Sequence, residues 1–210
     1  MTEDNAAKLA ARTRMVVIAL WSVIALELAT ILGQLAEAAG MVDLDEGMDG
    51  LTMIVAFSYM AYAVAMLICV LLVCLWLHRA HANLHEAGVG GLEYTPGWAV
   101  GWYFIPFANL VKPHGAMREL WHASHGETGD FRAPAPSLIN YWWAAWIAGN
   151  IVSNVSAQMA VRDPSLVAAA SLIGAVGSAL SVAAALLLLQ LVQRISAAQR
   201  DGRAAANVFA

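Results

Sequence analysis

Long apolar runs alternate with shorter polar segments along this chain, and the runs have the length of membrane-spanning helices. A hydrocarbon core about 30 Å thick needs about 20 apolar residues in helical form. Four segments meet that length, and the third of them is the least apolar. They are Met15–Leu35, Leu51–Leu77, Leu138–Ala160 and Leu166–Val192. The pattern predicts an all-α integral membrane protein with four transmembrane helices in a single domain over residues 1–210.

The segment between the second and third runs is apolar and aromatic, where a connecting loop is usually polar. From Pro96 to Trp121 it reads PGWAVGWYFIPFANLVKPHGAMRELW, with three prolines and three tryptophans. Its apolar part, Gly97–Phe107, is too short to cross a bilayer, and such sequence beside a membrane typically lies in the interface or dips into it. We predict a cytoplasmic re-entrant or interfacial hairpin over about residues 96–124. The second helix should continue to Gly88, and Pro113 should begin a new helix.

Composition and charge support a membrane location and give an orientation. The chain is 60% hydrophobic and 12% charged, whereas soluble domains carry about 25% charged residues. The first loop contains four acids (Asp43, Asp45, Glu46 and Asp49) and no base, while ten of the eleven bases lie in the two tails and the long loop. Those ten are Lys8, Arg12, Arg14, Arg79, Lys112, Arg118, Arg132, Arg194, Arg200 and Arg203. The positive-inside rule then places both termini and the long loop in the cytoplasm.

Signatures of enzymes and of nucleic-acid binding are absent from the sequence. The chain has no nucleophile elbow, phosphate-binding loop, dinucleotide fingerprint or intramembrane serine-protease pattern, and its net charge of −4 gives no nucleic-acid footprint. Cys69 and Cys74 are separated by about 500° of helical rotation, so they face different directions and are interpreted as packing residues. We therefore favour a non-enzymatic protein, with no predicted cofactor.

Two elements resemble a bacterial family of tetraspan membrane proteins described as domain of unknown function 4328. They are RAHANL (Arg79–Leu84) and YTPGWAVGWYFIPFANLVKPHGAMRELW (Tyr94–Trp121). The family pattern is R-A-x-x-N-L, then P-G-W-A-V-G-W-[WF]-F-x-P-x-A-N-L-x-K-P, then M-R-E-[IL]-W. This chain departs from it at His78 and His114, where tyrosine is expected, and at His81, where arginine or tyrosine is common. The resemblance implies four spans in a bacterial inner membrane but no activity, because the family has none assigned.

Polar and aromatic residues on the cytoplasmic side form the leading candidate site. Arg79, Asn83 and Glu86 recur at i, i+4 and i+7, so they share one helical stripe. Arginine and lysine at headgroup level suit a lipid phosphate or another anion. The alternatives are an internal ion-pair network that pins the hairpin, and an aromatic belt that explains the tryptophans. The candidate residues for binding an anionic lipid or a partner protein are Arg79, Asn83, Trp98, Trp102, Asn109, Lys112, Arg118 and Glu119.

Polar residues inside the predicted spans suggest a second function, a small ion or solute transporter or channel that acts as an oligomer. Glu27 lies near the middle of the first span, and an acid at that depth is costly enough to be a functional hypothesis by default. Asn150, Asn154 and Gln158 form an i, i+4, i+8 stripe on the third span, which we expect to face Glu27 across a polar cavity. The alternative is interhelical hydrogen bonding by an uncharged Glu27.

The histidines suggest a third function, a metal- or haem-binding membrane protein. All six lie between His78 and His125. His78, His81 and His85 recur at i, i+3 and i+7, and His122 and His125 at i, i+3, which are spacings that can hold zinc, copper or haem iron. No CxxC or HExxH motif accompanies them, and histidine also serves as an interfacial residue without a ligand.

Overall fold

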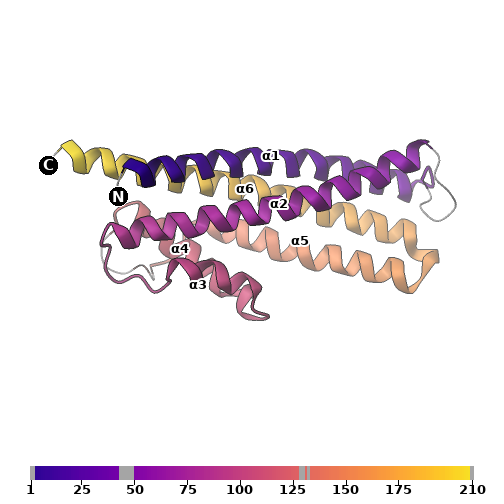
Figure 1. Cartoon of the computed structure of the whole chain (residues 1–210). Coiled ribbons are helices and arrows are strands. Elements are labelled where there is room, and N and C mark those ends of the chain that lie inside the picture. Colours follow the sequence, from indigo (N-terminus) through magenta and orange to yellow (C-terminus); the bar gives the residue numbers. More distant parts are fainter. Residues whose placement is uncertain (1–2, 43–49, 128–130, 132, 209–210) are drawn as a thin grey trace. The chain divides into compact units, whose positions relative to one another are not determined.

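Helices make up every regular element in the computed structural model, which describes residues 3–42, 50–127, 131 and 133–208 (Figure 1). The all-α prediction is therefore confirmed for the described residues. The acids of the first loop and Arg132 lie outside them. The elements are α1 (Glu3–Ala38), α2 (Gly50–Glu86), α3 (Pro96–Gly101), η1 (Trp102–Phe104), η2 (Ala108–Leu110), α4 (Lys112–Ser124), α5 (Ser137–Arg162), η3 (Pro164–Leu166) and α6 (Val167–Val208).

Within the described residues, three helices are long and apolar enough to cross a membrane. The qualifying stretches are Asp4–Ala38, Gly50–Glu86 and Pro164–Gly202, which contain the first, second and fourth predicted runs. The third run falls on α5, whose 26 residues exceed the length needed. Its asparagines and glutamine lower its hydropathy, so a crossing by α5 stays a prediction.

The long helices contribute to two compact units, each built from segments far apart in the sequence. Unit 1 consists of Met1–Ile18, Val70–Tyr141 and Leu187–Ala210, and unit 2 of Ala19–Cys69 and Trp142–Leu186. Neither unit is a contiguous stretch of chain, because its helical segments come from the beginning, middle and end of the sequence.

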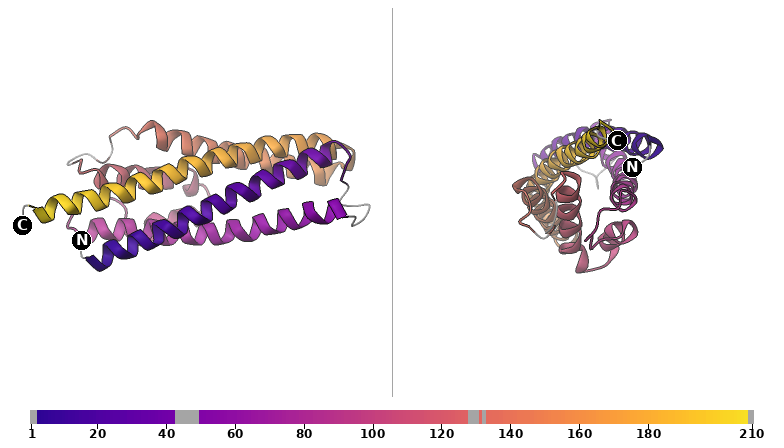
Figure 2. Two further views of the ribbon diagram at one scale, coloured as in Figure 1. Left: turned by 90° about the horizontal axis from the view of Figure 1, so that it is seen from above. Right: turned by 90° about the vertical axis from the view of Figure 1, so that its left-hand side faces the viewer.

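Unit 2 is a bundle of helical segments from α1, α2, α5 and α6, which run side by side in Figures 1 and 2. Glycines allow close approach between them. A Cβ atom on Gly177 of α6 would lie 3.0 Å from the backbone nitrogen of Ser153 on α5. A Cβ atom on Gly149 of α5 would lie 3.3 Å from the carbonyl oxygen of Gly177. Small residues at these positions let helix backbones pack closely in lipid.

Unit 1 joins the start of α1, the end of α2 and the end of α6 by buried side chains and hydrogen bonds. The indole Nε1 of the buried Trp76 donates to Ser196 Oγ at 3.0 Å, and the hydroxyls of Thr13 and Ser196 lie 2.8 Å apart. The start of α1 and the end of α6 therefore lie at the same end of this unit (Figures 1 and 2).

The segment predicted to form the hairpin folds as a series of short helices, and we keep the name hairpin for residues 96–124. The helix that precedes it ends at Glu86, just before Gly88, whose φ of +73° is a left-handed conformation that glycine adopts readily. Thr95 caps α3 by accepting a hydrogen bond from the backbone nitrogen of Trp98 at 3.3 Å. At the other end, α4 runs from Lys112 to Ser124 with Pro113 in its first turn, as the sequence predicts.

Candidate functional site

The base of the hairpin is held by one buried carboxylate. Glu119 on α4 is 3% exposed. Its two oxygens accept hydrogen bonds from the backbone nitrogens of Glu93, at 2.6 Å, and Tyr94, at 3.1 Å. Burial raises the pKa of Glu119, and the two backbone donors act against that rise. This carboxylate therefore ties the segment that enters the hairpin to the helix that leaves it.

An aromatic cluster packs beside the hydrogen bonds that Glu119 makes with Glu93 and Tyr94, which we call the Glu119 clamp. The buried Tyr94 packs with Ala99 and Ala116, and Trp102 lies against them. A Cβ atom on Gly115 would lie only 2.5 Å from the Tyr94 hydroxyl. Glycine at this position therefore makes room for the tyrosine, because any larger side chain would overlap it.

Lys112 lies at the edge of the aromatic cluster, and its side chain is 42% exposed. Its Nζ is 5.9 Å from the centroid of the Tyr94 ring and 5.6 Å from that of the Trp102 ring. Both distances are within the range of cation–π attraction. The same atom lies 3.7 Å from Glu93 Oε1, a loose ion pair near the surface.

Apolar side chains of the hairpin are exposed, with no cover from the rest of the described residues. Phe107 is 85% exposed, and it is the non-glycine residue with a positive φ, +63°, within the described chain. Trp98 is also exposed and lies beside Trp102, with ring centroids 4.8 Å apart. We call the exposed apolar residues of the hairpin the apolar rim: Trp98, Phe104, Ile105, Phe107, Leu110 and Val111.

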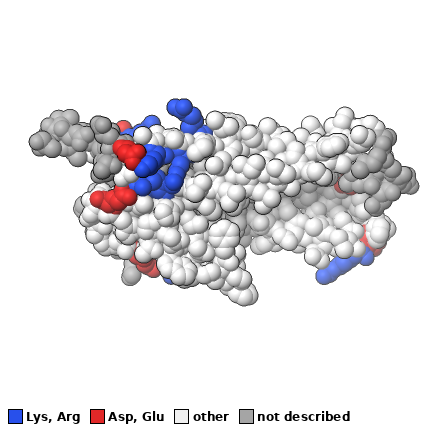
Figure 3. All heavy atoms as spheres, in the orientation of Figure 1, with Lys and Arg blue, Asp and Glu red and all other residues white. Residues whose placement is uncertain are grey.

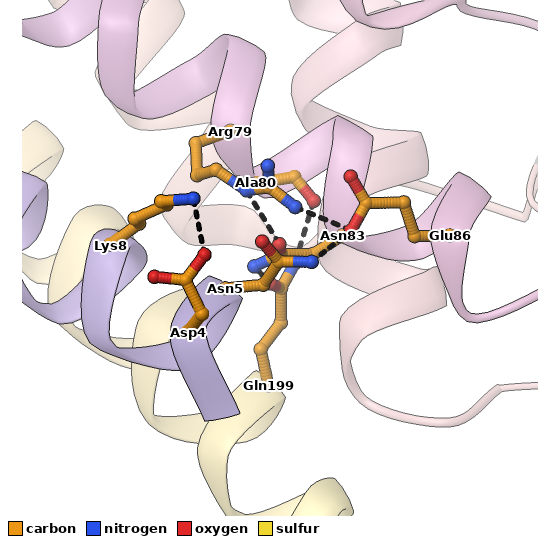
Figure 4. Close-up of polar contacts among 8 residues, drawn as sticks. All are labelled: Asp4, Asn5, Lys8, Arg79, Ala80, Asn83, Glu86 and Gln199. Atoms are coloured by element: carbon orange, nitrogen blue, oxygen red, sulfur yellow. Dashed lines mark hydrogen bonds and ion pairs between the residues drawn. The ribbon is translucent and has the colours of Figure 1, made fainter. Parts of the chain in front are cut away.

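Arg79 lies in a different cluster, formed by the ends of α1, α2 and α6 (Figure 4). Its Nε donates to Asn83 Oδ1, and its Nη2 donates to Glu86 Oε2, both at 2.7 Å. Asn5 of α1 donates to the same Glu86 oxygen. The guanidinium is thus engaged along its own helix and beside α1, as the internal-network alternative for this stripe requires.

The buried amides of Asn83 and Gln199 extend this network. Asn83 Nδ2 donates to Gln199 Oε1 at 3.1 Å. Gln199 Nε2 donates to the carbonyl oxygen of Ala80 at 3.1 Å and to Ser124 Oγ at 3.0 Å. Sequence reasoning missed Gln199 and Ser124, because nothing local indicates that residues more than 70 positions apart share one hydrogen-bond network.

The predicted binding residues are therefore divided. Arg79 and Asn83 belong to the internal network, whereas Trp98, Trp102, Lys112 and Glu119 belong to the hairpin and its base. Asn109 is half-buried in η2. Arg118 is half-buried on α4, and its enclosed Nε has no hydrogen-bond partner in the part of the chain that the structure describes. Among the described residues, no hydrogen bond or ion pair joins Arg79 to Lys112 or Arg118.

Further basic side chains of unit 1 gather near the ends of the long helices (Figure 3). Arg14, Arg194 and Arg200 are exposed. By contrast, Lys8 pairs with Asp4, and Arg12 donates to the carbonyl oxygen of Leu75 at 2.6 Å. From the sequence, these bases served only to predict how the chain is oriented in the membrane. Their exposure in the structure also makes them available to an anion.

The histidines have separate surroundings and do not converge on one site. His81 is buried with its Nδ1 3.1 Å from the carbonyl oxygen of Leu77, while His78 and His85 are exposed. His122 Nδ1 lies 2.5 Å from Glu127 Oε2, and the His125 ring stacks on Trp121. Among the described residues, no group of three or more His, Cys, Asp or Glu side chains is arranged to hold a metal.

Glu27 and the asparagine stripe, both in unit 2, do not meet as expected. Glu27 is 4% exposed and hydrogen-bonds with the side chains of Tyr62 and Ser178, while its Oε2 has no partner among the described residues. Asn150 and Asn154 are exposed on α5. The expectation that Glu27 and the asparagine stripe face each other across a polar cavity is therefore wrong. The α5 register turns the stripe outward, and Glu27 hydrogen-bonds with hydroxyls from α2 and α6 instead.

Comparison with known proteins gives one match. Residues 43–197 match the family model described as Domain of unknown function (DUF4328), which is more than half of the chain. The matched region begins just before α2, includes the whole hairpin and ends within α6. No curated protein and no solved structure matches the chain.

Proposed function

We propose, from the premise that this chain belongs to the DUF4328 family, that unit 1 is a non-enzymatic module of the bacterial inner membrane. Its hairpin inserts into the cytoplasmic leaflet as a re-entrant or interfacial element. Its basic side chains bind anionic lipid headgroups around that insertion.

The observation that carries this proposal is the apolar rim. Exposed apolar surface costs about 25 cal/mol per Å² in water, and contiguous apolar patches mark partner or membrane contacts. Phe107 adds a second cost, because a bulky residue held at a sparsely populated positive φ costs about 1–3 kcal/mol. Insertion into acyl chains removes the first cost and gives a reason for the second, since the strained turn leaves an aromatic side chain exposed.

The cationic side chains support the headgroup contact. An exposed ion pair such as that between Lys112 and Glu93 contributes about 0–1 kcal/mol, so a phosphate can compete for the lysine. Each lysine or arginine near an anionic leaflet contributes about 1 kcal/mol of attraction. The exposed Arg14, Arg194 and Arg200 lie on α1 and α6 of the same unit.

The number of membrane crossings should be even, which supports a fourth crossing by α5. The contact between the Thr13 and Ser196 hydroxyls, 2.8 Å apart, joins the start of α1 to the end of α6. If α1, α2 and α6 were the only crossings, those two ends would lie on opposite faces of the membrane. An even number of crossings keeps them together, and α5, which is 26 residues long, supplies the fourth. The basic tails then share the cytoplasmic face.

Depth measurement with a spin label tests the insertion. In a chain with Cys69 and Cys74 replaced by serine, a label is attached at Phe107→Cys, and a matched label is attached at Gly126→Cys in the polar loop. In nanodiscs, the label at position 107 should be accessible to oxygen and shielded from a water-soluble nickel chelate, and the label at position 126 should behave oppositely. Equal nickel access at both positions would refute insertion of the hairpin.

Lipid retention tests the headgroup contact separately. Native mass spectrometry would count phosphatidylglycerol molecules retained by the purified protein, with phosphatidylcholine as the neutral competitor. Lys112→Gln and a triple Arg14, Arg194 and Arg200→Gln variant should each retain less phosphatidylglycerol. The Arg162→Gln variant, altered at the far end of α5, is the control. Unchanged retention in both test variants would reject the lipid site.

Glu27 supports a second candidate function, ion or solute transport. A carboxyl group that is 4% exposed, meets side chains from two other helices and keeps one oxygen without a partner among the described residues is a site where a small cation or proton can bind. Liposome flux of protons and sodium should be lost in Glu27→Gln and kept in Glu37→Gln, a second acid of the same helix. Flux unaffected by Glu27→Gln would exclude this role.

A further inference from the structure

The outer face of α5 carries a row of primary amides that the described part of the chain leaves uncovered. Asn150, Asn154 and Gln158 are all exposed, and their i, i+4, i+8 spacing places them along one stripe. We call these three residues the amide face. Ile151 and Val155, also exposed, flank it. Asn150 lies close to the middle of α5, which runs from Ser137 to Arg162.

A different face of α5 already contacts α6. Ser156 Oγ donates to the carbonyl oxygen of Ala170 at 2.7 Å. Gly149 and Ser153 lie close to Gly177, as described above. The packing of unit 2 is therefore satisfied through the serine and glycine side of α5, and the amide face remains available to another molecule.

The amides use only part of their hydrogen-bonding capacity inside the helix. Asn150 Nδ2 donates to the carbonyl oxygen of Trp146 at 2.8 Å, and Asn154 Nδ2 donates to that of Asn150 at 2.9 Å. A primary amide has a second N–H and an oxygen with two acceptor sites. Each asparagine thus presents both a donor and an acceptor outward, and the surface that matches such a group best is another amide.

Lipid tails match the amide face poorly, because they offer no hydrogen bonds. Polar side chains in spanning helices rarely face lipid, and asparagine and glutamine hydrogen-bond across helix interfaces in membranes. This step rests on the proposed fourth crossing, since an amide face in water would need no partner. If α5 crosses the membrane, the three amides on its exposed side need hydrogen-bond partners on another helix.

We propose that the amide face binds the same face of a second copy of this chain. Two copies inserted with the same orientation are related by a two-fold axis along the membrane normal, so their α5 helices run parallel. Each amide then meets its own counterpart, Asn150 with Asn150 and Asn154 with Asn154. The contact is self-complementary, because every amide both donates and accepts, and Ile151 and Val155 pack beside it.

Disulfide trapping tests this pairing directly. Single cysteines at Asn150, Asn154 or Gln158 are introduced into the full chain with Cys69 and Cys74 replaced by serine, and the purified protein is placed in liposomes at low density. Oxidation should give covalent dimers from these positions. Leu67→Cys, on an exposed face of α2, is the matched control and should stay monomeric. No dimer from any of the three positions, or equal dimer from Leu67→Cys, would overturn the proposal.

A triple leucine variant provides the second readout. Asn150→Leu, Asn154→Leu and Gln158→Leu change exposed positions only, so the chain should keep its helicity and thermal unfolding. The association constant, measured by energy transfer at increasing lipid dilution, should fall at least tenfold, because the interhelical hydrogen bonds between the paired amides are lost. A dimer that persists unchanged in this variant would refute the amide pairing.

The same cysteines separate failure of the dimer from failure of the fourth crossing. A membrane-impermeant maleimide should not label Asn150→Cys in intact liposomes if α5 crosses. Labelling from the aqueous side would reject the crossing, and with it the premise of the dimer. Protection without trapped dimers would reject the dimer alone and leave the four-span topology standing.

Discussion

At the scale of single residues, Glu119 has the largest structural consequence. One side chain on α4 accepts two backbone hydrogen bonds from Glu93 and Tyr94, which lie more than 20 positions earlier in the chain. Without those bonds, two backbone donors at the hairpin base would lose their acceptors. The apolar rim is held in place because this base is fixed, so the proposed insertion depends on a residue that does not itself contact lipid.

Glu119→Gln should destabilise the hairpin by about 1–3 kcal/mol, because the amide has one acceptor oxygen and leaves one backbone donor unsatisfied. Hydrogen exchange in nanodiscs should show faster exchange at Glu93 and Tyr94. Glu93→Gln is the matched control, since it removes an exposed ion pair worth about 0–1 kcal/mol. Equal protection in both variants would contradict the role of this clamp.

The pH dependence of Glu119 follows from the direction of its shift. Burial raises its pKa, so the folded protein holds this proton at a higher pH than the unfolded chain does. Its contribution to the free energy of unfolding should therefore be fully present below the usual glutamate pKa and fall as the pH rises through the raised one. Carboxyl-carbon NMR of labelled protein should show Glu119 titrating above the usual glutamate pKa. A midpoint at or below that usual pKa would contradict the prediction.

At the scale of elements, the contact between α5 and α6 depends on glycine. The backbone nitrogen of Ser153 lies 3.0 Å from the place that a Cβ atom on Gly177 would occupy. Backbone atoms cannot move aside as the end of a flexible side chain can. The two helices therefore stay close only while position 177 lacks a side chain, and this contact also fixes which face of α5 turns outward.

Gly177→Ala should lower the stability of unit 2 by about 1–3 kcal/mol, because overpacking forces the helix backbones apart. Gly202→Ala is the matched control on the same helix, where a Cβ atom would meet nothing within 4 Å. That substitution should raise stability by up to about 1 kcal/mol through helix propensity. Thermal unfolding in detergent would compare them, and a Gly177→Ala variant as stable as Gly202→Ala would contradict the close contact.

At the scale of the whole molecule, the arrangement of the termini is the most consequential feature. Unit 1 contains both the start of α1 and the end of α6. The hydrogen bond between Thr13 and Ser196 is the observation from which we propose an even number of membrane crossings. The proposed lipid contact and the proposed dimer both assume the resulting topology, with unit 1 at the cytoplasmic leaflet.

Labelling in intact cells tests this topology. Ser165→Cys, in the turn between α5 and α6, should react with an impermeant maleimide, because four crossings place it outside the inner membrane. Gly126→Cys, in the loop before α5, should react only after the membrane is permeabilised. Protection of Ser165→Cys in intact cells, with labelling after permeabilisation, would reject the fourth crossing.

The sequence alone determined the features that depend on neighbouring residues. Apolar runs predicted the long helices, Gly88 marked the end of α2, Pro113 marked the start of α4, and the family motif predicted the matched family. The tertiary structure alone decided which side chains meet. Helical spacing shows that Asn150 and Asn154 share a face, but not that this face turns away from Glu27. It likewise groups Arg79 with Asn83 without revealing Gln199 as their partner. The physical reason is that a helix fixes directions about its own axis, whereas packing against distant helices decides what lies in each direction.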